Sequence, residues 1–126
     1  MKSLYIAIAV SFLLVAGSIA SSIYVKTATD KIGMRTEIIE RRIEKKEYES
    51  ALVAADELDR QIEKSKTLLC AVVDHKDIYE IKRSLYELRC YLYAEEEADA
   101  LAHCRAIVAV TEKISDNALP YVYNIL

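Results

Sequence analysis

A run of 22 residues without a charged side chain, Leu4–Val25, constrains this chain most. An α-helix rises about 1.5 Å per residue, so the run would be about 33 Å long and could cross a hydrocarbon core of about 30 Å. Lys2 and Lys26 flank the run, and Tyr5 and Tyr24 stand just inside them, where amphipathic rings suit the two headgroup layers. The run therefore predicts a membrane-spanning helix.

A cleaved signal peptide is the alternative for this segment. Residues 18–20, Ser-Ile-Ala, place small side chains where a signal peptidase requires them. Against cleavage, only a short stretch precedes the run, and the run continues past the cut to Val25. We expect residues 1–26 to remain as an anchor that contacts the lipid bilayer through Leu4–Val25.

The flanking charges leave the orientation of the anchor open. Lys2 and the α-amino group precede the span, whereas Lys26, Lys31 and Arg35 follow it. A positive-inside count would place the C-terminal part in the cytoplasm, but the signal-like N-terminus argues for the outside.

Residues 27–126 have the composition of one small helical domain. The chain contains only two Gly and one Pro, and 29% of its residues are charged. Helix-breaking residues are therefore scarce. The formal net charge of −3 provides no positive excess to neutralise phosphates, so no nucleic-acid partner is expected.

Apolar residues recur at helical spacing in four stretches of this domain. The fold class predicted is all-α, with an N-terminal transmembrane helix followed by an antiparallel bundle of about four helices arranged as two helical hairpins. The first helix is expected to continue from the span with little interruption. The four stretches are 27–46, 48–73, 78–92 and 96–114.

Two features are expected near the ends of these helices. Asp116-Asn117 is predicted to end the fourth helix, and the apolar tail 119–126 to pack back onto the bundle. Acidic residues followed by Ala-Leu open both 47–52 and 96–101, which lie 49 positions apart and hint at a duplicated hairpin.

Asp74 and His75 form the first candidate site. A carboxylate beside a histidine suits a bound metal or small ligand. The structural alternative is that Asp74 caps the third helix, with Asp77 completing a near capping box and His75 bonded locally at the turn.

Tyr79, Tyr86 and Tyr93 form the second candidate site, because they recur every seven residues beside the apolar pattern of the third helix. Such a stripe suits either a partner-binding groove or a wide edge of the core with hydroxyls that reach water.

The sequence indicates no catalytic constellation. It contains no glycine-rich phosphate loop, nucleophile elbow or zinc-binding helix motif, so neither an enzyme nor a cofactor is expected. Cys70, Cys90 and Cys104 lack metal-ligand spacing and suit small buried side chains, while a bridge between Cys90 and Cys104 stays open.

The whole chain resembles the domain of unknown function 4363 family, small membrane-anchored helical proteins of Gram-positive, often spore-forming, bacteria. The resemblance implies a helical domain outside the cytoplasm and brings no activity or cofactor. It rests on the order and spacing of the N-terminal MKS with the span, Glu47-Tyr48-x-x-Ala51, Val72-Val73-Asp74-His75-x-x-Ile78, Leu85-x-x-Leu88-x-x-Tyr91-Leu92, Asp99-Ala100-Leu101 and the terminal Asn124-Ile125-Leu126.

Two functions are consistent with these features. The first is a protein-interaction or scaffold module at the outer face of the cell membrane, with Tyr79, Tyr86 and Tyr93 as contacts to a protein partner. The alternative is a metal or small-ligand binding sensor centred on Asp74 and His75.

Overall fold

The computed structural model describes the backbone of residues 1–125 and the side chains of residues 1–118. Within these residues the chain is all-α and has no strand. The side-chain packing predicted for the tail 119–126 lies outside the described residues. The helices are α1 (Lys2–Glu44), α2 (Tyr48–Val72), α3 (His75–Tyr93) and α4 (Glu97–Ile125).

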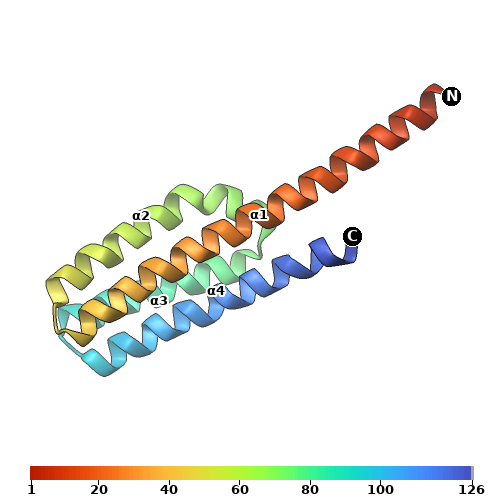
Figure 1. Ribbon diagram of the computed structural model, residues 1–126. Coiled ribbons are helices and arrows are strands. Elements are labelled where there is room, and N and C mark those ends of the chain that lie inside the picture. The colour runs from red at the N-terminus through yellow and green to blue at the C-terminus, as the bar shows by residue number, and fades with distance from the viewer. Residues whose placement is uncertain (126) are drawn as a thin grey trace.

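The helices form an antiparallel bundle that is square in cross-section. α1 packs against α2 and α4, and α3 packs against the same two helices. Figure 1 shows the α1–α2 and α3–α4 turns together at one end, the distal end, and the α2–α3 turn at the other end, the base. The predicted pair of helical hairpins is thus confirmed, and the contact between α1 and α4 closes the square.

One stripe of each helix fills the core, as the apolar spacing predicts. In α3 the buried apolar residues, Ile78 to Leu92, fall at intervals of three and four, which is one face of a helix. Two buried threonines, Thr36 and Thr111, donate their hydroxyls to carbonyl oxygens one turn back, at 2.7 and 2.6 Å, so no polar group of theirs is left unpaired. The large side chains buried most completely are Ile39, Ile43, Leu58, Ile62, Leu69, Ile81, Leu85, Leu88, Leu92 and Ile107.

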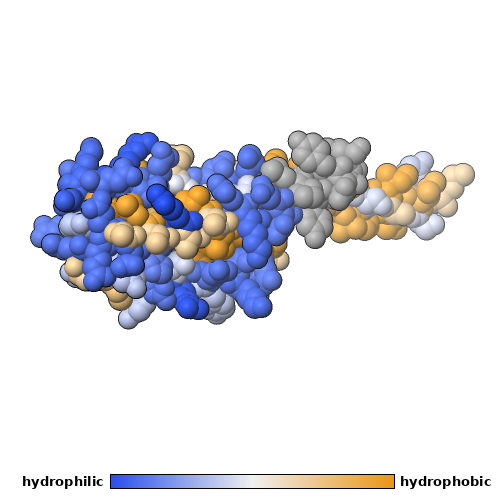
Figure 2. All heavy atoms as spheres, turned by 90° about the horizontal axis from the view of Figure 1, so that it is seen from below, coloured by the Kyte–Doolittle hydropathy of each residue, from blue (hydrophilic) through white to orange (hydrophobic). Residues whose placement is uncertain are grey.

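α1 is a single helix of 43 residues and runs without a break through the predicted boundary between 26 and 27. Residues 2–17 are all exposed and project beyond the base, whereas core packing begins at Val25. Among the described residues only α1 is long and apolar enough to cross a membrane. Figure 2 shows the projecting part as a hydrophobic rod beside a mostly hydrophilic bundle surface.

α4 is longer than the sequence pattern predicts. The expectation that Asp116-Asn117 ends the helix is wrong, because α4 continues to Ile125. Both residues are exposed, so their polar side chains reach water without interrupting the backbone ladder. Ala118, one residue further, packs against the core, so the continued helix lies beside α1 (Figure 1).

The two distal turns have the same geometry, which supports the duplicated hairpin. Lys46 and Glu95, 49 positions apart, both have left-handed backbone, with φ of 61° and 57°. After each, the next amide donates to a carbonyl five residues back, Glu47 to Arg42 at 2.9 Å and Glu96 to Tyr91 at 3.0 Å. The Lys46 and Glu95 amides themselves donate to carbonyl oxygens three residues back, so both turns are Schellman caps. The left-handed position of such a cap is usually occupied by glycine.

Replacing Lys46 with glycine should therefore stabilise the bundle by about 0.5–1 kcal/mol, because glycine adopts positive φ without steric cost. The same gain is expected for Glu95→Gly. Chemical unfolding of the full chain in detergent, followed by far-ultraviolet circular dichroism, measures both.

Lys45→Gly is the matched control, since Lys45 has φ of −82° in the same turn. It should destabilise the bundle by about 0.5–1 kcal/mol. Equal effects of Lys45→Gly and Lys46→Gly would contradict the left-handed turn.

Candidate functional site

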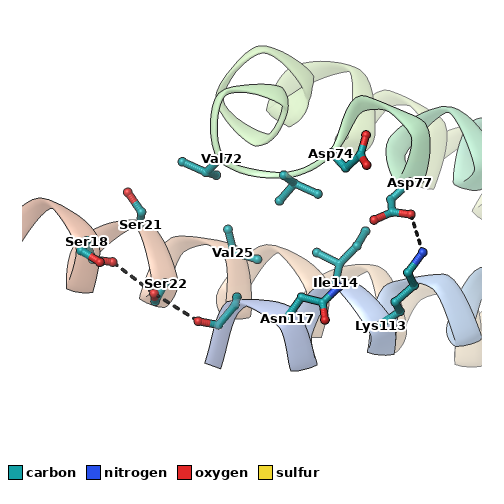
Figure 3. Close-up of a pocket in the computed structure, with 12 residues that line it drawn as sticks. Ser18, Ser21, Ser22, Val25, Val72, Asp74, Asp77, Lys113, Ile114 and Asn117 are labelled. Carbon is teal, nitrogen blue, oxygen red and sulfur yellow. Dashed lines mark hydrogen bonds and ion pairs between the residues drawn. The ribbon is translucent and has the colours of Figure 1, made fainter. Parts of the chain in front are cut away.

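A cavity of about 490 Å³ lies at the base of the bundle, where α1 leaves the core. We call it the base cavity; Figure 3 shows it between α1, the α2–α3 turn and α4. Its volume is in the range of sites for small molecules. Its lining comprises Ser18, Ser21, Ser22 and Val25 of α1, Val72, Val73, Asp74 and Asp77 around the α2–α3 turn, and Lys113, Ile114, Asn117 and Ala118 of α4.

An ion pair between Asp77 and Lys113 forms the polar wall of the base cavity. Asp77 is only 7% exposed, and its carboxylate accepts a hydrogen bond from the Lys113 amine at 3.1 Å (Figure 3). The bond to Asp77 raises the pKa of Lys113 above its ordinary value. The amine therefore stays charged at neutral pH, and the contact is lost only as pH rises through that raised pKa.

The opposite wall belongs to the predicted membrane span. Ser22 places its hydroxyl 3.1 Å from the Ser18 carbonyl oxygen and 3.4 Å from the Ala118 carbonyl oxygen (Figure 3). The second contact joins α1 to α4 across 96 residues of sequence. The base cavity thus has hydroxyl groups and Val25 on the α1 side, and the charged side chains of Asp74, Asp77 and Lys113 on the side of α3 and α4.

The Asp74 and His75 site has the geometry of a helix cap. Asp74 accepts a hydrogen bond from the Lys76 amide at 3.0 Å, which confirms the structural interpretation of Asp74 as the cap of α3. His75 is exposed and is the first residue of that helix. Asp77 turns toward Lys113 instead of completing a capping box. Within the described residues no group of three His, Cys, Asp or Glu side chains is placed to hold a metal ion.

Tyr79, Tyr86 and Tyr93 lie on the outer surface of α3 and not at the edge of the core. They are 60%, 66% and 77% exposed. We call them the tyrosine stripe. A helix turns about 100° per residue, so the stripe lies about 130° from the centre of the buried face. This angle can be calculated from the sequence alone, and it distinguishes an exposed partner-binding surface from an edge of the core.

The family description entitled "Domain of unknown function (DUF4363)" matches residues 19–125. The chain belongs to this family. No curated protein and no solved structure matches the chain. The matched region begins inside the predicted span, so the DUF4363 region includes the wall of the base cavity that Ser21 and Ser22 provide.

Ion pairs between α2 and α3 occupy the surface beside the tyrosine stripe. Lys82 contacts Asp59 at 3.0 Å and also binds Glu63, and Arg89 contacts Asp56 at 3.2 Å. The Lys66 amine lies 5.4 Å from the centre of the Tyr79 ring. Lys82 and Arg89 are therefore paired with α2 within the DUF4363 domain, and the exposed tyrosine rings lie beside these pairs.

The three cysteines of the DUF4363 domain are all free thiols in separate environments. Cys104 is fully buried, and burial raises the pKa of its thiol to about 12, with a smaller effect from Glu40. Cys70 is half-buried and Cys90 is exposed, so Cys104 alone fits the expectation of a small buried side chain. The bridge between Cys90 and Cys104 that the spacing left open is not formed.

Neighbouring residues of α3 should differ sharply in their effect on stability. Leu85→Ala should cost about 2–5 kcal/mol, because Leu85 is fully buried and its loss leaves a cavity. Tyr86→Ala should cost less than about 0.5 kcal/mol, as is usual for exposed positions. Chemical unfolding of each full-length variant in detergent compares them, and a loss above about 2 kcal/mol for Tyr86→Ala would place Tyr86 in the core.

Proposed function

We propose that the protein is a single-pass membrane protein whose DUF4363 bundle is a protein-interaction or scaffold module at the outer face of the cell membrane. The observation that supports the membrane anchor is that the apolar first part of α1 is exposed. Phe12, Leu13 and Leu14 are 74%, 69% and 71% exposed. Leaving such a side chain in water costs about 1.5–3 kcal/mol relative to burial, so a whole helix of them needs an apolar medium.

The length of the free segment indicates how deep the bundle lies. Residues 2–17 extend about 24 Å as a helix, less than a hydrocarbon core of about 30 Å. The missing length comes from residues 18–21, of which Ser18 and Ser21 line the base cavity. The base of the bundle would therefore lie within the headgroup layer.

The exposed thiol of Cys90 provides a test of the outer-face orientation. In a Cys70→Ser variant, a membrane-impermeant thiol reagent should label intact cells at Cys90, because that side chain is exposed on α3. Labelling that needs prior permeabilisation would place the bundle in the cytoplasm.

A Cys70→Ser, Cys90→Ser variant is the matched control for that experiment. It retains only Cys104, whose burial and raised pKa should prevent labelling until the bundle is unfolded. Labelling of this control in intact cells would show that the reagent reports unfolded protein.

The tyrosine stripe is the proposed contact surface of the module. Its first and last members are 14 positions apart, which is about 21 Å along α3. A seven-residue repeat is the period at which two helices stay in contact over several turns. Tyrosine is also enriched among the residues that contribute most to protein interfaces. We therefore infer a helical partner segment with apolar side chains at the same repeat.

Photo-crosslinking in living cells tests the partner. A benzophenone amino acid at Tyr79, Tyr86 or Tyr93 should give an adduct with the same protein at all three positions, since one helix would follow the whole stripe. Arg60, exposed on α2, is the control position and should give no such adduct. Adducts of equal yield at Arg60, or none along the stripe, would contradict the proposed surface.

A further inference from the structure

We propose that the base cavity binds the headgroup of a membrane lipid that carries a phosphate and a primary ammonium group, of the phosphoethanolamine class. The inference rests on the membrane anchor proposed above but not on the tyrosine stripe. It joins three observations: the position of the cavity along α1, the charges of its polar wall, and its apolar exit.

The position of the base cavity matches the headgroup layer. Ser18, Ser21 and Ser22 belong both to the uncharged run and to the cavity wall. Lys113 and Asp77 lie on the opposite side, toward the bundle (Figure 3). A molecule that touches both walls must be polar at one end and compatible with the bilayer at the other, as a lipid headgroup is.

The charges of the wall favour a cationic group together with an anionic one. Asp74, Asp77 and Lys113 sum to one negative charge. The Lys113 amine contacts one oxygen of Asp77, and this side chain is 60% exposed, so the amine can also reach a phosphate. A primary ammonium group would contact the carboxylates, because its three N–H donors suit carboxylate oxygens.

The remaining lining suits the rest of such a lipid. The hydroxyls of Ser18 and Ser21 and the amide of Asn117 add neutral hydrogen-bonding groups to the lining. Val25 and Val72 are apolar, and α1 continues from the cavity into the exposed segment 2–17. Acyl chains attached to a headgroup in the base cavity would therefore lie along this segment, in the bilayer.

Native mass spectrometry of the full chain in detergent tests the proposal. Phosphatidylethanolamine, phosphatidylcholine and phosphatidylglycerol are added separately. One phosphatidylethanolamine per chain should be retained at least about tenfold more tightly than the other two, since a quaternary ammonium lacks N–H donors and glycerol lacks the positive charge. Equal retention of the three lipids would overturn the proposal.

Variants of the cavity distinguish this site from general lipid contact. Asp77→Asn and Lys113→Met should each remove the preference. Asp59→Asn is the matched control, because Asp59 pairs with Lys82 on the outer α2–α3 surface and leaves the cavity unchanged. Loss of the preference in Asp59→Asn to the same extent would contradict a site at the base.

A third variant covers the case in which Asp77→Asn does not fold. Ser21→Leu fills the base cavity from α1 and leaves the Asp77–Lys113 pair intact, so it should abolish the preference with an unchanged melting temperature. A full preference in Ser21→Leu would overturn the proposal.

Two further arms separate the sources of failure. Soluble phosphoethanolamine should compete weakly, because it lacks the acyl chains; competition as strong as that of the lipid would replace the lipid with a soluble ligand. Membrane fractionation of cells is read independently: a chain found in the soluble fraction overturns the anchor. A membrane-bound chain without lipid preference overturns only the headgroup site.

Discussion

The packing of α4 against α1 is the contact on which the rest of this structure depends. No loop connects these two helices, since they are the first and the last of the chain. Without their contact, the two hairpins would each leave part of an apolar stripe in water. The seam runs from the distal end to the base, where Ser22 meets the Ala118 carbonyl oxygen at 3.4 Å. Closing the square in this way both completes the core and forms the base cavity.

The continuity of α1 adds a second consequence. One helix of 43 residues serves as a wall of the core in its second half and projects as an apolar rod in its first half. A continuous helix curves gently and has no sharp kink, so the angle and depth of the bundle would be coupled to those of the span. The base cavity and the tyrosine stripe would then sit at defined heights above the bilayer, the first in the headgroup layer and the second along the outward face of α3.

Charges are distributed differently at the two candidate surfaces. Around the tyrosine stripe they pair with one another across α2 and α3 at the solvent boundary, where such pairs contribute little to stability. Asp77 instead lies on the buried side of α3 and is held by a lysine from α4. A carboxylate that is removed from water but adjoins an open cavity is costly for the fold alone. For this reason the base cavity, and not the surface with its ion pairs, is the proposed lipid-binding site.

The sequence by itself determined the local features of this protein. The uncharged run located the part of α1 that projects, although its last residues belong to the bundle. The three-four spacing identified the buried apolar residues of α3, and the early acidic residues located two equivalent turns. Asp74 was recognisable as a cap because a cap involves only residues adjacent in the chain. The exposure of Tyr86 followed from its rotation about the helix axis, although the seven-residue spacing alone did not reveal it.

Only the tertiary structure decided which distant residues meet. Asp77 and Lys113 are 36 positions apart, and Ser22 and Ala118 are 96 apart. Likewise, α4 continues past Asp116 beside α1, and a prediction from local helix propensity takes no account of such a neighbour. Helical periodicity fixes the face that each helix buries, but the rotation and axial offset of one helix against another depend on the whole core. The base cavity arises from those offsets, and so it appears only when all four helices are in place.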